Sequence, residues 1–188
     1  MNRMSSEMIN GARVWIAKLG TTSGDNTITA DTLPDAPTAE KQGPWLKMGR
    51  IANFKAARTS NDSTLTATHD DGMYHDIKLK RITARTFQFS SYDMIPEAFR
   101  LAFGLAEDIA DGTEQAIGGS STDTIRCWMY FEITDSYRGG NTLLTGACLV
   151  DLSLANDVEF KSDPTQVDYS AEMIFNKLET LDPTAVTA

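Results

Sequence analysis

The sequence predicts a mainly β protein, an antiparallel β-sandwich or barrel with one flanking α-helix at about residues 93–106. Several segments alternate apolar and polar residues with the period of two that strands require, and turn-forming residues separate them. Only one segment shows the 3.6-residue repeat of a helix. With 188 residues, of which 41% are hydrophobic and 23% charged, the chain is predicted to form one domain over residues 1–188.

The N-terminal part begins with an expected arm over residues 1–11, followed by a strand from Ala12 to Leu19. Residues 20–44 are rich in glycine, proline and aspartate, which predicts a loop of about 25 residues. Loops longer than about 12 to 15 residues are uncommon in compact domains unless they bind something or lack order. The segment 20–44 is therefore a candidate contact arm.

A polar hairpin is predicted next. Residues 45–54 are extended with an interruption at Gly49 that indicates a bulge or kink, and residues 59–62 (TSND) are typical of a turn. Residues 63–69 then alternate threonine with Leu65 and Ala67, so one face is expected to meet water. The longest strand is predicted at 77–89; its phase slips near Arg81 and Ile82, which indicates either a bulge or two partly buried faces.

The predicted helix carries an apolar stripe at i, i+3, i+4, i+7 and i+8 from Ile95 onward. Its candidate contacts with the sheet are Ile95, Phe99 and Phe103. Burial of both phenylalanines would contribute about 3 to 6 kcal/mol, so Phe99→Ala is expected to be severely damaging.

Three strands are predicted in the C-terminal half, at 125–133, 143–154 and 167–177, followed by a frayed or arm-like tail at 179–188. In the first strand, residues of odd number from Ile125 to Ile133 face inward. The opposite face presents Arg126, Trp128 and Tyr130, a combination typical of protein interfaces and equally of packing beneath a loop.

Charge is distributed unevenly along the chain, whose net charge is −9. Residues 41–100 hold ten Lys or Arg against six Asp or Glu, whereas residues 151–188 hold two Lys against eight Asp or Glu. Two solvated faces and complementary contacts between copies both account for this asymmetry. An acidic chain is not the type that grips phosphates through a basic surface.

Catalytic and metal-binding patterns are weak. His69, Asp70, Asp71, His75 and Asp76 include metal-ligating side chains, but a hydrated turn is the favoured interpretation. Gly118 and Gly119 precede no lysine at the spacing of a phosphate-binding loop. We therefore expect no enzymatic activity, no catalytic residues, no cofactor and no metal. Cys127 and Cys148 are expected to be buried free thiols, and no segment predicts membrane insertion or a signal peptide.

The order of segments resembles the major tail tube proteins of long-tailed bacteriophages. The residues that carry this resemblance are the W-x-x-x-G-x-I segment (Trp45, Gly49, Ile51), the polar hairpin, the strand ending in Phe87 and Phe89, and the helix IPEAFRLAFG at 95–104. The resemblance implies a virion protein without enzymatic activity, assembled in the host cytoplasm. Hexameric rings would stack into a hollow tail tube for DNA delivery, with four strands per subunit paired edge to edge around the lumen.

The partners that the resemblance implies are further copies of the chain, the tape measure protein, the tail terminator and distal tail proteins, and DNA in transient, non-specific passage. The 20–44 loop is expected to reach a neighbouring subunit. A second hypothesis is another tail or virion component on a related fold: a tail terminator, a stopper or an adhesin-like module.

The candidate residues for the lumen or for contacts between subunits are Trp45, Lys47, Arg50, Arg58, Asp62, Thr64 and Thr66. The basic residues near this hairpin do not suit a strictly acidic lumen. We expect them instead to face the next subunit and to pair with its acidic C-terminal third.

Overall fold

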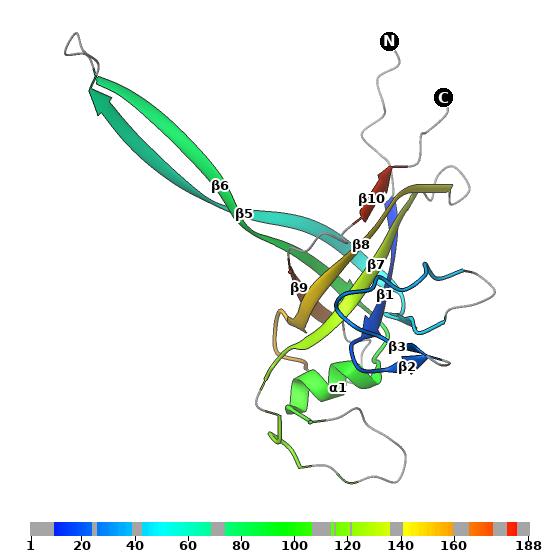
Figure 1. Ribbon diagram of the computed structural model, residues 1–188. Coiled ribbons are helices and arrows are strands. Elements are labelled where there is room, and N and C mark those ends of the chain that lie inside the picture. Colours follow the sequence, from blue (N-terminus) through cyan, green and yellow to red (C-terminus); the bar gives the residue numbers. More distant parts are fainter. Residues whose placement is uncertain are drawn as a thin grey trace.

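The computed structural model describes residues 10–23, 26–38, 43–68, 74–106, 114, 116–120, 122–135, 141–159, 166–174 and 180–183. Ten strands and one helix occur in these ranges (Figure 1). The elements are β1 (Asn10–Lys18), β2 (Thr22–Ser23), β3 (Asn26–Thr27), β4 (Leu46–Lys47), β5 (Ile51–Thr68), β6 (Tyr74–Ser91), α1 (Pro96–Phe103), β7 (Ile125–Asp135), β8 (Asn141–Leu154), β9 (Val167–Met173) and β10 (Thr180–Pro183).

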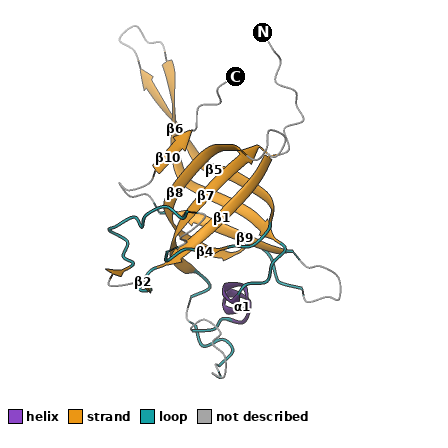
Figure 2. Ribbon diagram, turned by 90° about the vertical axis from the view of Figure 1, so that its right-hand side faces the viewer, coloured by secondary structure: helices purple, strands orange, loops and turns teal. Residues whose placement is uncertain are grey.

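Eight of the strands form one antiparallel sheet in the order β4-β1-β7-β8-β9-β6-β5, with β10 paired to β8. The sheet curls so that β1, β7 and β8 cross over β5, β6 and β9 (Figure 2). The amide of Met48 donates to the carbonyl of Val14 at 2.9 Å and continues the pairing of β4 with β1. β1 also lies against β5, so the two ends of the sheet meet. The predicted mainly antiparallel β fold with one flanking helix is confirmed.

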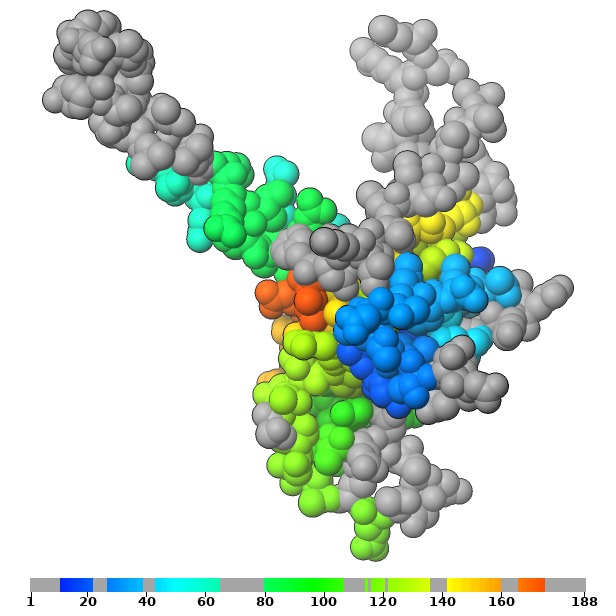
Figure 3. Space-filling view, viewed as in Figure 1, coloured from blue at the N-terminus to red at the C-terminus, as the bar shows by residue number. Residues whose placement is uncertain are grey.

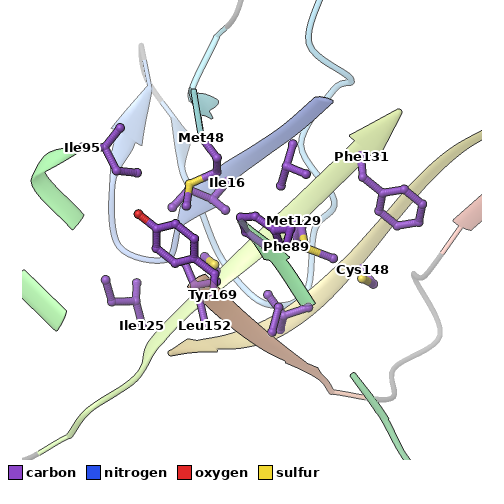
Figure 4. Packing of buried hydrophobic residues seen from close by; sticks show 14 of the residues in the cluster. Ile16, Met48, Phe89, Ile95, Ile125, Met129, Phe131, Cys148, Leu152 and Tyr169 are labelled. Carbon is purple, nitrogen blue, oxygen red and sulfur yellow. The ribbon is translucent and has the colours of Figure 1, made fainter. Parts of the chain in front are cut away.

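The main core lies between the two halves of the curled sheet (Figure 4). It takes alternate residues from each strand, because successive side chains of a strand point to opposite faces. Odd-numbered residues of β7 and β9 are buried, as predicted, except for the half-buried Ile133; the fully buried members include Met129, Tyr169 and Cys127. Both cysteines are buried free thiols, which confirms that prediction.

Gly146 and the ring of Phe131 make a close contact in this core. Gly146 in β8 pairs with Phe131 in β7, and a Cβ atom at Gly146 would lie 2.4 Å from Cζ of the Phe131 ring. The ring therefore covers the glycine. It also packs against Phe54 and Phe87 at centroid distances of 5.1 and 5.3 Å, which ties β7 to the base of the β5–β6 hairpin.

A second cluster covers the opposite face of β1, β7 and β8. It joins strand residues to residues of the segment between β1 and β4: Trp15, Trp128 and Leu149 pack with Ile28 and Trp45. Indole Nε1 of Trp128 donates to the carbonyl of Thr29 at 2.8 Å. The described part of the loop, in blue in Figure 3, thus lies against the chain's own sheet.

The predicted turn at 59–62 is wrong, because β5 continues through it to Thr68 in unbroken pairing with β6. The register shifts between Thr59 and Ser60, opposite the segment from Ala84 to Ile82. The phase slip predicted near Ile82 is therefore a bulge. Residues 59–62 accommodate the extra residue of the facing strand instead of reversing the chain.

The predicted helix–sheet contacts require correction. α1 spans eight residues, and Gly104 ends it in the left-handed conformation with φ of 60°. Ile95 is buried, but Phe99 is half-buried and Phe103 is 39% exposed, their rings stacked on one another at 6.4 Å. Because the short helix packs beside β8, Ala98 and Leu101 face the core in place of the two phenylalanines.

The C-terminal tail is also more ordered than expected, since residues 180–183 form β10 on the edge of β8. The interruption predicted at Gly49 is confirmed: φ is 81°, and a Cβ atom there would lie 2.5 Å from Cβ of Asp93. The predicted arm at 1–11 lies outside the described residues except for Asn10 and Gly11 in β1.

Candidate functional site: a projecting hairpin and a polar sheet face

The β5–β6 hairpin extends far beyond the rest of the sheet (Figure 1). Each strand has 18 residues, or about 60 Å at 3.3 Å per residue. Pairing of β6 with β9 covers only Thr86–Ser91, so Tyr74–Arg85 has no strand on that side among the described residues. β5 is the last strand of the sheet and has β6 as its only strand partner in the described chain.

The hairpin therefore presents two open edges. An open edge carries unpaired N–H and C=O groups that can pair with a strand of another chain. Soluble proteins normally keep edge strands short or covered, whereas these are long. The two edges run in opposite directions, so an edge of β5 in one copy can continue the sheet along β6 of the next.

Aromatic residues anchor the base of the hairpin. Phe54 stacks on Phe87 and Phe89 at centroid distances of 5.9 and 6.5 Å, and Phe89 stacks on Tyr169 at 5.1 Å. Phe89 is 1% exposed. This layer fixes the direction in which the hairpin leaves the body, because its rings are shared with β7 and β9.

The opposite side of the same strands forms the polar sheet face, which runs across β5, β6, β9 and β8. Cross-strand partners share a face, so the register groups the polar residues together. They are Asn53, Lys55, Thr86, Gln88, Ser90, Asp168, Ser170, Glu172, Asp151 and Ser153. Four of them are exposed, Ser90 is buried, and the other five are half-buried; the exposed residues are Asn53, Lys55, Gln88 and Glu172.

Hydrogen bonds connect this polar sheet face internally. Asn53 Nδ2 donates to Ser90 Oγ at 3.0 Å, and Ser90 Oγ in turn donates to Asp168. Next to the face, Arg126 makes a bidentate ion pair with Asp151 at 2.8 and 2.9 Å. The face carries hydroxyl, amide and carboxylate groups and the ammonium group of Lys55, with no large apolar side chain among its members, and is suited to contact with water.

The seven residues predicted for the hairpin fall into two groups. Arg58, Asp62, Thr64 and Thr66 lie on β5, as expected. Trp45, Lys47 and Arg50 do not belong to the hairpin, because the chain turns at Gly49 before β5 begins.

These three residues have separate environments. Trp45 is 4% exposed, and its Nε1 donates to the carbonyl of Asp35 at 2.6 Å. Lys47 is exposed on β4. Arg50 pairs with Asp93 at 3.1 Å. Trp45 was a candidate for the lumen or for contacts between subunits, but within this chain its indole is buried in the second cluster.

The predicted face of Arg126, Trp128 and Tyr130 is not open to another copy. Trp128 is 0% exposed beneath the loop, and Tyr130 packs against Trp15 and Trp45 at 5.6 and 5.9 Å. Of the two interpretations, packing beneath a loop holds for Trp128. Only Arg126 remains exposed.

The sequence analysis did not identify the polar sheet face, nor Arg85, which lies opposite Arg58 in the hairpin. The signal was present in residues 86–90 (TFQFS), where Thr86, Gln88 and Ser90 alternate with two buried or half-buried phenylalanines. Pairing with β9 adds Asp168, Ser170 and Glu172 to the same face, and no local pattern reveals that pairing.

A largely buried ion pair joins Lys18 at the end of β1 to Glu97 in α1, with Nζ and Oε1 2.9 Å apart. Burial raises the pKa of the Cys127 thiol and of the Tyr169 phenol, and for Tyr169 the nearby Glu97 carboxylate adds to the effect. A buried thiol with a raised pKa remains protonated at neutral pH and is a poor nucleophile.

Within the described ranges, no three His, Cys, Asp or Glu side chains are placed to hold a metal ion. His69, Asp70 and Asp71 lie outside the described residues. No helix in the described part of the chain combines the length and hydropathy needed to cross a membrane.

No protein-family model and no curated protein matches the chain. Among solved structures, it is similar to the sheath/tube terminator of an extracellular contractile injection system, PVC, in the extended state; the TM-score is 0.41 and the identity 7%, over 97% of this chain and 98% of that one. It is also similar to a chain of the PVC sheath-tube complex in the extended state, with a TM-score of 0.40 and 7% identity over 93% and 89% of the two chains. Neither similarity assigns the chain to a family.

Proposed function

We propose that this chain is a structural, non-enzymatic subunit of a phage-type tail tube, and that copies join edge to edge through the β5–β6 hairpin into stacked rings. The observation that carries the proposal is the hairpin itself, with its two long open edges. Pairing between copies satisfies the backbone groups that the monomer leaves to water. A closed ring has no free edge.

The polar sheet face supports a lumen lined by β5, β6, β9 and β8 of each subunit. Hydroxyl and amide side chains remain hydrated in a water-filled channel, and Asp168 and Glu172 repel the phosphates of passing DNA. Salt limits that repulsion to about 8 to 10 Å, so only side chains at the channel wall contribute. DNA delivery, enclosure of a tape measure protein and contact with terminator and distal tail proteins belong to this proposal, as does location in a virion tail assembled in the host cytoplasm.

The test is assembly of the purified protein at increasing concentration, followed by light scattering and negative-stain electron microscopy. Hollow rings or tubes are expected, and a monodisperse monomer at every concentration would overturn the proposal. Rings that never stack would support the second candidate, a terminator or stopper. The predicted contact of the 20–44 loop with a neighbouring ring is tested by deleting 22–42, although this loop also covers Trp128.

A shortened hairpin gives a sharper test. Deletion of 61–64 together with 78–81 removes four paired positions from each strand and shortens the hairpin by about 13 Å. The deletion is even in number, so the remaining residues keep their faces. The body should keep its tryptophan fluorescence while assembly is lost.

The matched control is Ile117→Ser. Ile117 is 77% exposed on the loop after α1, away from the hairpin, and this variant should assemble as the unmodified protein does. Equal assembly of the shortened variant would remove the hairpin from the proposed interface.

A further inference from the structure

Two arginines lie directly opposite one another where the hairpin leaves the body. Arg58 in β5 pairs in register with Arg85 in β6. Both side chains are exposed, and neither makes an ion pair or a side-chain hydrogen bond with the residues that the structure describes. Like charges that face each other across neighbouring strands repel and destabilise the pair.

The position of this pair is defined by the aromatic layer. Arg58 and Arg85 lie on the same face as the Phe54 and Phe89 pair, four residues further along each strand. They are therefore on the side opposite the polar sheet face.

The neighbouring charges do not relieve the repulsion. Further out on the same face, Asp62 is engaged with Lys80, with Oδ1 and Nζ 4.0 Å apart. Lys55 and Arg81 lie on the other face and are also cationic.

The rest of the chain has the complementary charge. Residues 51–91 contain six Lys or Arg and four Asp or Glu, a net charge of +2. Since the whole chain has a net charge of −9, the residues outside this segment have a net charge of −11. A second copy therefore offers carboxylates to a pair of guanidinium groups that has no described acceptor in its own chain. Guanidinium groups bind carboxylates with two parallel hydrogen bonds.

We propose that Arg58 and Arg85 together form a docking contact for carboxylates on a second copy of this chain. This inference rests on the proposed function, because it concerns the same association between copies. In the free chain the two arginines repel each other, and in the assembled state the carboxylates neutralise both. The pair thus favours the docked hairpin over the free one.

The test compares R58Q/R85Q with K55Q/R81Q, which removes the same number of charges from the opposite face of the hairpin. R58Q/R85Q should raise the concentration at half assembly by about tenfold at low salt and should reduce its dependence on salt. The free R58Q/R85Q chain should be no less stable toward urea than the unmodified chain, because a repulsion is lost. K55Q/R81Q should shift assembly by less than about twofold.

A charge-preserving variant identifies the partner surface. R58K/R85K should still assemble, and a zero-length carbodiimide reagent should then join the substituted positions to an Asp or Glu of another copy, as read by mass spectrometry of mixed isotope-labelled chains. Cross-links confined to one copy would overturn the inference.

The outcomes separate the two proposals. A monomeric unmodified protein overturns the proposed function and this inference with it. Assembly of R58Q/R85Q at the unmodified concentration, with unchanged salt dependence, overturns only the role of the arginines. Loss of binding to a short DNA duplex without any loss of assembly would likewise overturn it, because the arginines would then serve phosphates.

Discussion

Replacement of Lys18 by methionine should destabilise the fold severely, because it leaves a buried carboxylate without its cation. The side chain of Glu97 is only 4% exposed, against 20% for Lys18, and one carboxylate oxygen, Oε2, has no hydrogen-bond partner among the residues that the structure describes. Removal of one partner from a buried ion pair typically costs about 3 to 5 kcal/mol. That is a large part of the roughly 5 to 15 kcal/mol by which a domain is stable.

The assay is urea unfolding followed by tryptophan fluorescence, at a concentration where the chain is monomeric. Glu97→Gln should cost less than Lys18→Met, because the more exposed Lys18 can turn toward water while a buried carboxylate cannot. In the double variant K18M/E97Q much of the Lys18→Met cost should be recovered, giving a coupling energy above about 1 kcal/mol. A loss below about 1 kcal/mol for Lys18→Met, or strictly additive effects, would refute the assigned role of the pair.

Three other predictions follow from the packing. Gly146→Val should cost at least about 1 to 3 kcal/mol in urea unfolding, because the new side chain must displace the Phe131 ring; an unchanged midpoint would contradict the contact. Phe89→Ala should cost about 3 to 5 kcal/mol and Phe103→Ala about 1 kcal/mol or less, since Phe89 is 1% and Phe103 39% exposed; equal losses would show that the helix packs differently. Burial raises the pKa of the Cys127 thiol above its ordinary value of 9.0, so the folded chain holds its proton where the unfolded chain releases it. The free energy of unfolding should therefore keep the contribution of this thiol below about pH 9 and decrease above it, by up to about 1.4 kcal/mol per pH unit. The free energy of unfolding of the Cys127→Ala variant should decrease less steeply with pH. Parallel curves for the two proteins would contradict the assignment.

The strands and their inward faces could be read from the sequence where one local period dominates. Residues 125–133 and 167–173 alternate cleanly, and their odd-numbered side chains are buried except for the half-buried Ile133. The bulge next to Ile82 was also visible as a change of phase. The helix was predicted too long, and two of its three predicted core contacts were wrong. Ala98 and Leu101 are apolar like the phenylalanines, and only the position of β8 selects which of them meet the core.

The candidate site could be predicted in part. A polar hairpin was expected, but with its turn at residues 59–62. That segment is typical of a turn and yet remains paired with β6, so the observed hairpin is much longer than the predicted one. Trp45 was a candidate for the lumen or for contacts between subunits, and Trp128 for an interface or for packing beneath a loop. Each indole instead donates to a backbone carbonyl of the 20–44 loop, which closes over them.

The sequence by itself determined the β class, the location of most strands and the absence of any strong catalytic motif, because alternation and turn chemistry are properties of neighbouring residues. Only the tertiary structure decided which second faces are covered. Lys18 meets Glu97 across 79 positions and Trp128 meets Thr29 across 99. Such contacts depend on how the sheet curls and which strands pair, and both are set by the summed burial of distant segments rather than by the residues on either side.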